Sequence, residues 1–273
     1  MWNLIKMDFY RLIISKTAKI GAIVAALMGV LYIFFSVGLV ALTRFALNAD
    51  PELAVNLATL LSQAGWMAGV DFSEIVFRGT GALALFVGCM ISASFIGSEQ
   101  SCGYTKNFAG QLTNKGYMAV SKFVVTSFGQ VMVLAIYTVV GAISAKLIFG
   151  QYISGYDMKN LFAALGLRLM LHIAINAIIV FLCTLTKSHS VAMMAGCIFG
   201  LGVTKAAYLS VSMLLSILKI NVDIANYTPD GINGQLSLYT VGELTQKAII
   251  VSIAFVIAFV AANYYVVRNR DVR

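Results

Sequence analysis

Three residues with polar side chains interrupt a long apolar stretch near residue 170. Arg168, His172 and Asn176 recur every four residues, so on a helix they form one polar stripe. Polar groups inside a membrane usually face the interior of a helix bundle or an aqueous cavity, and they often mark a transport path. We therefore take this stripe as the candidate lining of a translocation path. The alternative is that the Arg168 side chain extends to the outer membrane–water interface, while the side chains of His172 and Asn176 form hydrogen bonds to neighbouring helices.

Residue types that commonly perform chemistry do not occur here with the spacing that chemistry needs. The chain has two histidines and four cysteines without a CxxC pair, which is not the spacing of a zinc site or a disulfide framework. Neither HExxH nor GxSxG occurs, so an intramembrane hydrolase has no evident catalytic residues. No Gly-x-x-x-x-Gly-Lys-Ser/Thr loop occurs either, so any ATP must be bound by another polypeptide. We expect no catalytic residue, metal or cofactor in this chain.

Composition places these residues in a membrane protein. Of the 273 residues, 60% are hydrophobic and only 11% are charged, against about 25% charged in soluble domains. A spanning helix needs about 20 mostly apolar residues, and six such runs are present. The fold predicted is therefore an all-α integral membrane protein, a single transmembrane domain over residues 1–273. Its six transmembrane helices are expected at about 20–43, 79–98, 123–149, 162–186, 191–218 and 248–267.

The distribution of charge predicts how the chain is oriented. With the N-terminus inside the cell, the inner segments hold eleven of the basic residues and three acids, and the outer segments hold seven bases and eight acids. Cytoplasmic segments carry the excess of Lys and Arg in membrane proteins. We therefore predict that both termini are cytoplasmic, and we ascribe the net charge of +8 to this asymmetry and not to nucleic-acid binding.

Two cytoplasmic segments have patterns of their own. Residues 1–17 combine apolar residues at helical spacing with several basic ones, which is typical of an amphipathic helix lying in the membrane interface; a simple basic anchor is the alternative. Residues 99–117, between the second and third spans, are polar and glycine-containing, and they are long enough for a short helix that docks on a cytoplasmic partner. The alternative is a merely solvated loop.

These segments carry a resemblance to a known family. The opening LIKMDFYRLIISK, the patterns E-x-x-x-G-Y-x-K-N and G-x-x-x-x-K-G-Y-x-x-x-S-K after the second span, and the basic ending YYVVRNRDVR resemble the type 2 ATP-binding-cassette (ABC) exporter permeases of Gram-positive bacteria. The resemblance implies that residues 1–17 are a connecting helix and that 99–117 hold a coupling helix that docks on the ATPase. Tyr104 stands where Thr is more usual in that family. The coupling residues implied are Glu99, Gly103, Tyr104, Lys106 and Asn107.

The resemblance also implies a function. The chain would be the permease subunit of an exporter in the bacterial cytoplasmic membrane, with ATP and Mg²⁺ bound by a separate ABC ATPase subunit. A second copy or a related permease would complete the path, and the substrates would be hydrophobic or amphipathic compounds, with antimicrobial or toxin peptides the best guess. The alternative is a secondary transporter of small solutes that does not use ATP. Against it, no acid lies in any of the six predicted spans, so ion coupling lacks an evident carrier.

The fifth run, 191–218, leaves two questions open. Lys205 falls near its middle, so either a lysine lies at mid-membrane, or the span ends near Thr204 and a separate helix follows; the resemblance, which implies re-entrant helices between the last two spans, favours the second. Small residues recur every four positions at Ala192, Gly196 and Gly200. Such a ladder lets helices approach closely, either between two copies of the chain or within one.

Overall fold

The protein is a bundle of long helices. The computed structural model describes residues 1–49, 55, 72–101, 114–149, 158–217 and 223–269, and within these ranges helices joined by short turns make up the secondary structure, without strands. Five helical stretches are long and apolar enough to cross a membrane, so the chain has the architecture of an all-α, multi-pass membrane protein, as predicted. In order, the elements are α1 (Trp2–Ile14), α2 (Lys16–Ala49), α4 (Phe72–Gly79), the π-helix η1 (Thr80–Ala84), α5 (Leu85–Ser101), α7 (Gly116–Phe149), α8 (Met158–Thr186), α9 (His189–Gly200), α10 (Thr204–Ile217), the 3-10 helix η2 (Ile224–Tyr227), α11 (Pro229–Gln235) and α12 (Val241–Asn269).

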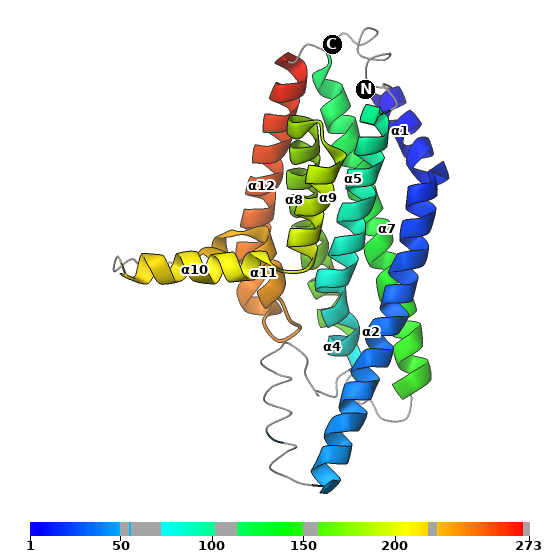
Figure 1. Cartoon of the computed structure of the whole chain (residues 1–273), viewed down its shortest axis with the longest axis vertical. Helices are drawn as coiled ribbons and strands as arrows, with labels where there is room; N and C mark the ends of the chain where they lie inside the picture. Colours follow the sequence, from blue (N-terminus) through cyan, green and yellow to red (C-terminus); the bar gives the residue numbers. More distant parts are fainter. Residues whose placement is uncertain (50–54, 56–71, 102–113, 150–157, 218–222, 270–273) are drawn as a thin grey trace.

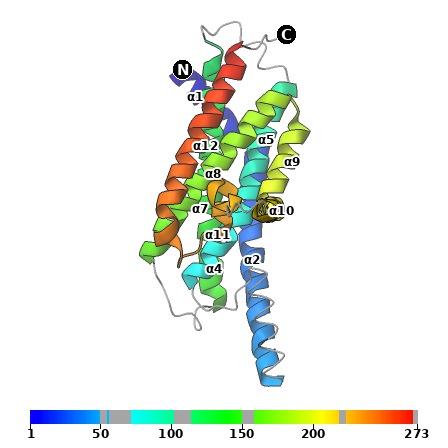
Figure 2. The ribbon, with the colours of Figure 1, turned by 90° about the vertical axis from the view of Figure 1, so that its left-hand side faces the viewer.

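The long helices run along one axis, and α1 lies at the same end of the bundle as the C-terminal end of α12 (Figure 1). We call this end the inner end, in keeping with the predicted orientation, and the opposite end the outer end. In Figure 2, α9 lies beside α5 and α8, and α10 is seen nearly end-on because it runs across the bundle axis. The α4–η1–α5 stretch is central: 72% of its most apolar window is buried, against 17% for α2 and 11% for α12.

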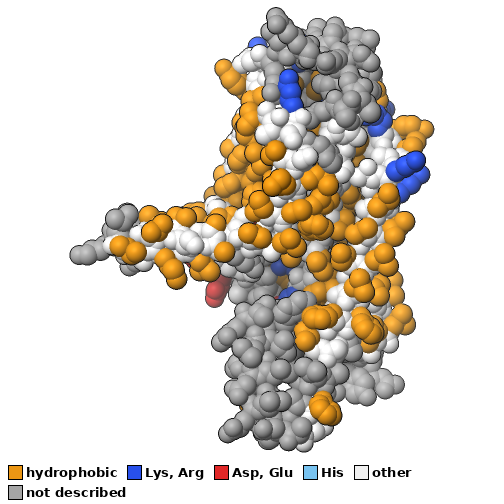
Figure 3. Space-filling model, viewed as in Figure 1, with side chains coloured by type: hydrophobic (Ala, Val, Ile, Leu, Met, Phe, Trp, Pro, Cys, Tyr) orange, Lys and Arg blue, Asp and Glu red, His pale blue; other side chains and the backbone are white. Residues whose placement is uncertain are grey.

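Apolar side chains occur over much of the described surface in the face that Figure 3 shows, in addition to those in the core. Exposed large hydrophobic side chains occur along α2, α7, α10 and α12, among them Phe34, Ile143, Met213 and Ile257. A soluble protein rarely exposes contiguous apolar surface on this scale, whereas hydrocarbon accepts it without cost. The outer faces of these helices are therefore the lipid-facing surface.

The predicted fifth span is divided into two helices. α9 ends at Gly200, a turn follows in which Gly202 has a positive φ of 70°, and α10 begins at Thr204. A straight helix over 191–218 is therefore wrong, and the alternative of a break near Thr204 describes the chain. Lys205 stands in the first turn of α10, not at mid-helix. With 12 residues, α9 is roughly 18 Å long, shorter than a hydrocarbon core of about 30 Å.

The second span also differs from its prediction. Its helical stretch begins at Phe72 instead of residue 79 and includes Glu74, whose side chain is buried. The statement that the predicted spans contain no acid therefore does not hold for the structure. Residues 73–99 form one candidate span, so Glu74 and Glu99 stand at its two ends.

The N-terminal segment forms α1, which the Ser15 backbone separates from α2. Leu4, Asp8 and Leu12 are buried, while Trp2 and Ile13 remain exposed. An exposed apolar pair beside a buried line is the arrangement that a helix at a membrane interface needs. Sequence reasoning did not identify the buried line, because an acid lies in its centre.

Candidate functional site

At the inner end, one buried carboxylate joins three helices. Glu99, near the end of α5, is 1% exposed. Its Oε1 accepts a hydrogen bond from Arg11 Nη1 of α1 at 2.8 Å, and its Oε2 lies 2.5 Å from Lys122 Nζ of α7. A buried charge persists only when it is paired in this way. Two cations from different helices thus hold Glu99, and we call Arg11, Glu99 and Lys122 the inner ion cluster.

A second carboxylate extends this cluster along α1. The Asp8 side chain accepts a hydrogen bond from Ser121 Oγ at 2.6 Å and lies 3.6 Å from Arg11 Nη1. Burial raises the pKa of Asp8 above its usual value of 3.8, although the Ser121 hydrogen bond acts in the opposite direction. The acids and bases together attach α1 to the ends of α5 and α7, the two helices that flank residues 102–113.

Of the five predicted coupling residues, the structure describes only Glu99. Gly103, Tyr104, Lys106 and Asn107 lie outside the described residues. Glu99 faces the interior of its own chain, where it bonds Arg11 and Lys122. Its role in this geometry is therefore to hold the helices that lead into the predicted docking segment. Sequence reasoning identified Glu99 but not its partners, which lie 88 and 23 positions away.

At the outer end, the guanidinium of Arg168 joins three elements. Arg168 Nη1 donates to Phe77 O at 2.5 Å and to Thr80 Oγ1 at 2.8 Å, and Nη2 donates to Leu236 O at 2.9 Å. The guanidinium carbon lies 3.6 Å from the centre of the Phe77 ring, a cation–π contact. Arg168 is 2% exposed, so it does not extend to the interface as the alternative interpretation proposed.

The π-helix η1 explains how a backbone inside a span can bond side chains. A π-turn interrupts the regular i→i−4 ladder, and Phe77 O and Gly81 O are used by side chains from other helices. Asn233 Nδ2 of α11 donates to Gly81 O at 3.0 Å. Gly81 lets these groups approach, because a Cβ there would lie 3.3 Å from the Arg168 guanidinium carbon.

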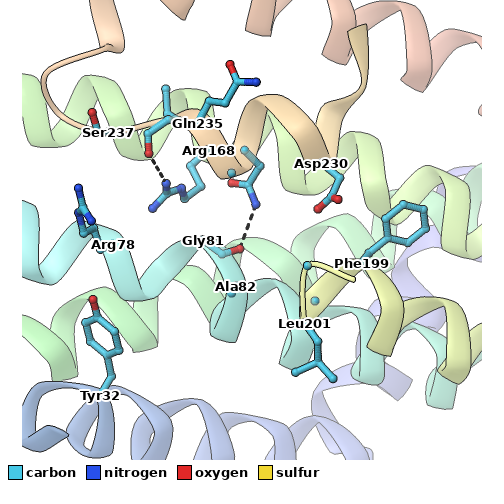
Figure 4. A pocket seen from close by; sticks show the side chains of 15 residues that line it. Tyr32, Arg78, Gly81, Ala82, Arg168, Phe199, Leu201, Asp230, Gln235 and Ser237 are labelled. Carbon is cyan, nitrogen blue, oxygen red and sulfur yellow. Dashed lines mark hydrogen bonds between the residues drawn. The ribbon is translucent and has the colours of Figure 1, made fainter. Parts of the chain in front are cut away.

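Beside these bonds lies a cavity of about 560 Å³, which we call the outer cavity (Figure 4). Its charged lining residues are Arg78, Arg168 and Asp230. Arg78 Nε is ion-paired with Glu74 Oε1 at 2.7 Å, and Glu74 Oε2 accepts from the Leu238 backbone N–H. Asp230, in the first turn of α11, accepts a hydrogen bond from Thr204 Oγ1.

The predicted stripe divides between a cavity and a helix contact. Arg168 lines the outer cavity, while His172 and Asn176 are fully buried and are not among the residues that line it. Asn176 Nδ2 donates to Thr126 Oγ1 of α7 at 3.0 Å, which is the bond to a neighbouring helix that the alternative expected. Sequence reasoning missed Asp230 and Asn233, although Thr228 and Pro229 before them are a helix-start signal that could have placed both on one short helix.

The small-residue ladder packs against α5 of the same chain. A Cβ on Gly196 would lie 3.0 Å from Cys89 Cβ, and one on Gly200 would lie 2.6 Å from Phe86 Cβ. Ala192 is fully buried. The predicted contact between two copies at these residues gains no support from this geometry, because α5 occupies the face.

No model of a known protein family matches this chain, and no curated protein matches it. The class that the fold defines is therefore a multi-pass, all-helical membrane protein. Its described part carries a buried ion cluster at one end of the bundle and a charged cavity toward the other.

Proposed function

We propose that this chain is the membrane-spanning permease subunit of an exporter driven by a separate ATP-binding-cassette ATPase. The observation that supports the proposal best is the inner ion cluster. It joins α1, α5 and α7 through Glu99 at the edge of the polar segment 99–117. A load applied to that segment by a partner would reach three helices at once, because breaking a buried ion pair by displacing one partner is costly.

In this proposal the chain performs no covalent chemistry. ATP and Mg²⁺ are bound by the ATPase subunit, and both termini and residues 99–117 face the cytoplasm of a bacterial cell. A second copy or a related permease completes the path, which opens alternately to each side as the ATPases close and reopen. The expected substrates remain hydrophobic or amphipathic compounds, including antimicrobial or toxin peptides.

The test is reconstitution with the separate ABC ATPase that the proposal requires, to be sought first in the neighbouring reading frames. Replacing Lys106 by Ala or Glu99 by Gln should leave ATP hydrolysis running while substrate transport falls. Replacing Glu243, an exposed acid at the start of α12, by Gln is the matched control and should change neither. Transport by the purified chain without any ATPase or nucleotide would refute the proposal.

Orientation is tested separately. A cysteine in place of Tyr117, near the start of α7 and 37% exposed, should be protected in intact cells from a membrane-impermeant maleimide. One in place of Tyr239, which is 69% exposed at the outer end, should be labelled. Both variants are made in a background without the four native cysteines. Labelling of position 117 in intact cells would show that the predicted docking segment lies outside the cell, which contradicts the proposal.

A secondary transporter is the second candidate function. One observation from the structure supports it, although the sequence showed no acid in the predicted spans. Glu74 and Asp230 are buried, at 5% and 4% exposure, near the outer cavity, and buried acids are the usual carriers of ion coupling. The reconstitution distinguishes the two candidates: an ion gradient alone should drive uptake for a secondary transporter and should drive none for the ATPase-dependent permease.

A further inference from the structure

The outer cavity has two ends of opposite charge. Arg78 and Arg168 lie toward one side and Asp230 toward the other, with Gly81 between them (Figure 4). The basic side chains Arg78 and Arg168 are balanced by the acids Glu74 and Asp230, so these four groups have no net formal charge. A ligand with a large net charge of either sign would disturb this balance in a site of reduced dielectric.

Two buried polar atoms at the cavity make no hydrogen bond to the residues that the structure describes. They are Arg168 Nε, a donor, and Asn233 Oδ1, an acceptor, and both residues line the cavity. Arg168 and Asn233 are 2% and 6% exposed. Since buried polar atoms are nearly always bonded, these two atoms are an unused donor and an unused acceptor on side chains that line the cavity.

The two unbonded atoms favour groups of opposite charge, one an anionic group and the other a cationic group. The donor Arg168 Nε belongs to a cation, so its natural partner is an anionic oxygen. The acceptor Asn233 Oδ1 stands three residues after Asp230 on α11, and residues three apart share one helix face. An acceptor beside a carboxylate is suited to the N–H groups of an ammonium.

We infer that the outer cavity binds a zwitterion, with its anionic oxygens at Arg168 and its ammonium group at Asp230 and Asn233. The volume of about 560 Å³ is within the range of about 300–1,000 Å³ for small-ligand sites. A free peptide and the headgroup of a zwitterionic phospholipid both carry this pair of groups. If the zwitterion is the substrate of the path, the inference rests on the proposed function. As a statement that the cavity binds a zwitterion, it depends on the cavity alone.

The experiment measures binding without nucleotide or ATPase, using the full chain in lipid nanodiscs. Isotope-labelled glycylglycine is the soluble probe, and its acetylated and amidated form, which has neither charge, is the matched probe. Phosphatidylethanolamine, supplied in the nanodiscs in place of an uncharged lipid, is the lipid probe. Binding of glycylglycine at least about tenfold tighter than the blocked form assigns the site to soluble zwitterions. Retention of phosphatidylethanolamine by the protein when the nanodiscs are dissolved in detergent, with no glycylglycine binding, assigns the site to the lipid headgroup.

Asp230→Asn tests which residues are responsible. This isosteric change keeps a hydrogen-bond acceptor for Thr204 and removes the charge, so binding of the zwitterion that occupies the site should weaken by about tenfold or more. Glu243→Gln, an acid lost outside the cavity, should bind as the unchanged protein does. Thermal unfolding of both variants shows that they are folded.

The inference is overturned if neither zwitterion binds, if the blocked probe binds as tightly as glycylglycine without lipid retention, or if the folded Asp230→Asn variant matches Glu243→Gln. Because the assay contains no ATPase, such a failure leaves the ATP-driven permease to its own test. Conversely, zwitterion binding would persist if transport proved independent of ATP.

Discussion

Arg11 and Glu99 form an ion pair of 2.8 Å across 88 residues of sequence. The pair joins the short helix at the N-terminus to the inner end of the most buried span, and Lys122 completes it from the other side. The same carboxylate is thereby shared between two cations from two helices, so changes at any of the three positions should affect the other two.

The first prediction concerns the Glu99–Lys122 pair. Glu99→Gln leaves Lys122, whose side chain is 9% exposed, without its charged partner, and breaking such a buried pair costs about 3–5 kcal/mol. We expect the free energy of unfolding in detergent to fall by an amount in this range. Chemical denaturation followed by tryptophan fluorescence measures it.

The double variant Glu99→Gln/Lys122→Gln supplies the control. If the pair interacts as the structure shows, the double variant loses less stability than the sum of the two single variants. Additive losses would mean that the two side chains do not interact.

The second prediction concerns Arg168. Lysine keeps the charge of Arg168 but cannot donate in the planar, forked geometry that reaches Phe77 O and Leu236 O together. Arg168→Lys should therefore destabilise the protein by about 2–3 kcal/mol, the value of one or two hydrogen bonds to a charged group. The denaturation midpoint measures the loss.

Arg78→Lys is the comparison for this substitution. Arg78 is ion-paired within its own helix, to Glu74 four residues earlier, and a lysine at that spacing can still pair. We expect a loss of less than about 1 kcal/mol. Equal losses at the two positions would contradict the role of Arg168 in joining three elements.

The third prediction concerns the close contact of α9 with α5. Gly200→Ala places a Cβ 2.6 Å from Phe86 Cβ and 2.7 Å from its Cα, and backbone cannot move aside as a flexible side chain does. Overpacking of this kind costs about 1–3 kcal/mol. Gly141→Ala, where no atom lies within 4 Å of the new Cβ, should not destabilise. Thermal unfolding of the two variants checks the difference, and a stable Gly200→Ala variant would show that the helices are not this close.

The fourth prediction is a pH dependence at Asp8. Burial raises the pKa of Asp8 in the folded protein above 3.8, so between 3.8 and the raised pKa the folded protein holds more protons than the unfolded chain. The contribution of Asp8 to stability is then largest at low pH and is lost as pH rises through the folded pKa. Asp8→Asn removes this contribution, so the difference between the two proteins should change across the window.

Denaturation midpoints between about pH 4 and about pH 7 measure this dependence. The wild type should lose stability relative to Asp8→Asn as pH rises, while Glu243→Gln should follow the wild type. Parallel curves for the wild type and Asp8→Asn would show that burial does not raise the pKa of Asp8 in the folded state.

The sequence predicted most of what depends on local hydrophobicity. Five long apolar helices match predicted spans because a run of about 20 apolar residues has few alternatives to crossing a bilayer. The sequence left two predictions open for residues 191–218, because Lys205 was compatible both with a straight span and with a new helix that begins near Thr204. It therefore did not predict the break after Gly200 uniquely. The pairing of Arg11 with Glu99, or of Arg168 with the carbonyls of Phe77 and Leu236, depends on which helices become neighbours, and no local pattern encodes that.

In the candidate site too, the sequence predicted what depends on local composition and did not predict what depends on helix packing. Arg168 was recognisable because a cation in an apolar run is rare. Glu74 and Asp230 were counted among the acids of the outer segments. Only the packing of α4 and α11 against the bundle brings Asp230 to the cavity and Glu74 to Arg78 beside it.

The shortness of α9 has a consequence for how the protein is made. A translocon releases a segment into the bilayer when it is apolar and long enough to span it, and the twelve residues of α9 are too few to remain there alone. α5 supplies the missing partner surface through Phe86 and Cys89. We therefore expect stable insertion of this part of the chain to depend on the second span, which precedes it in the sequence.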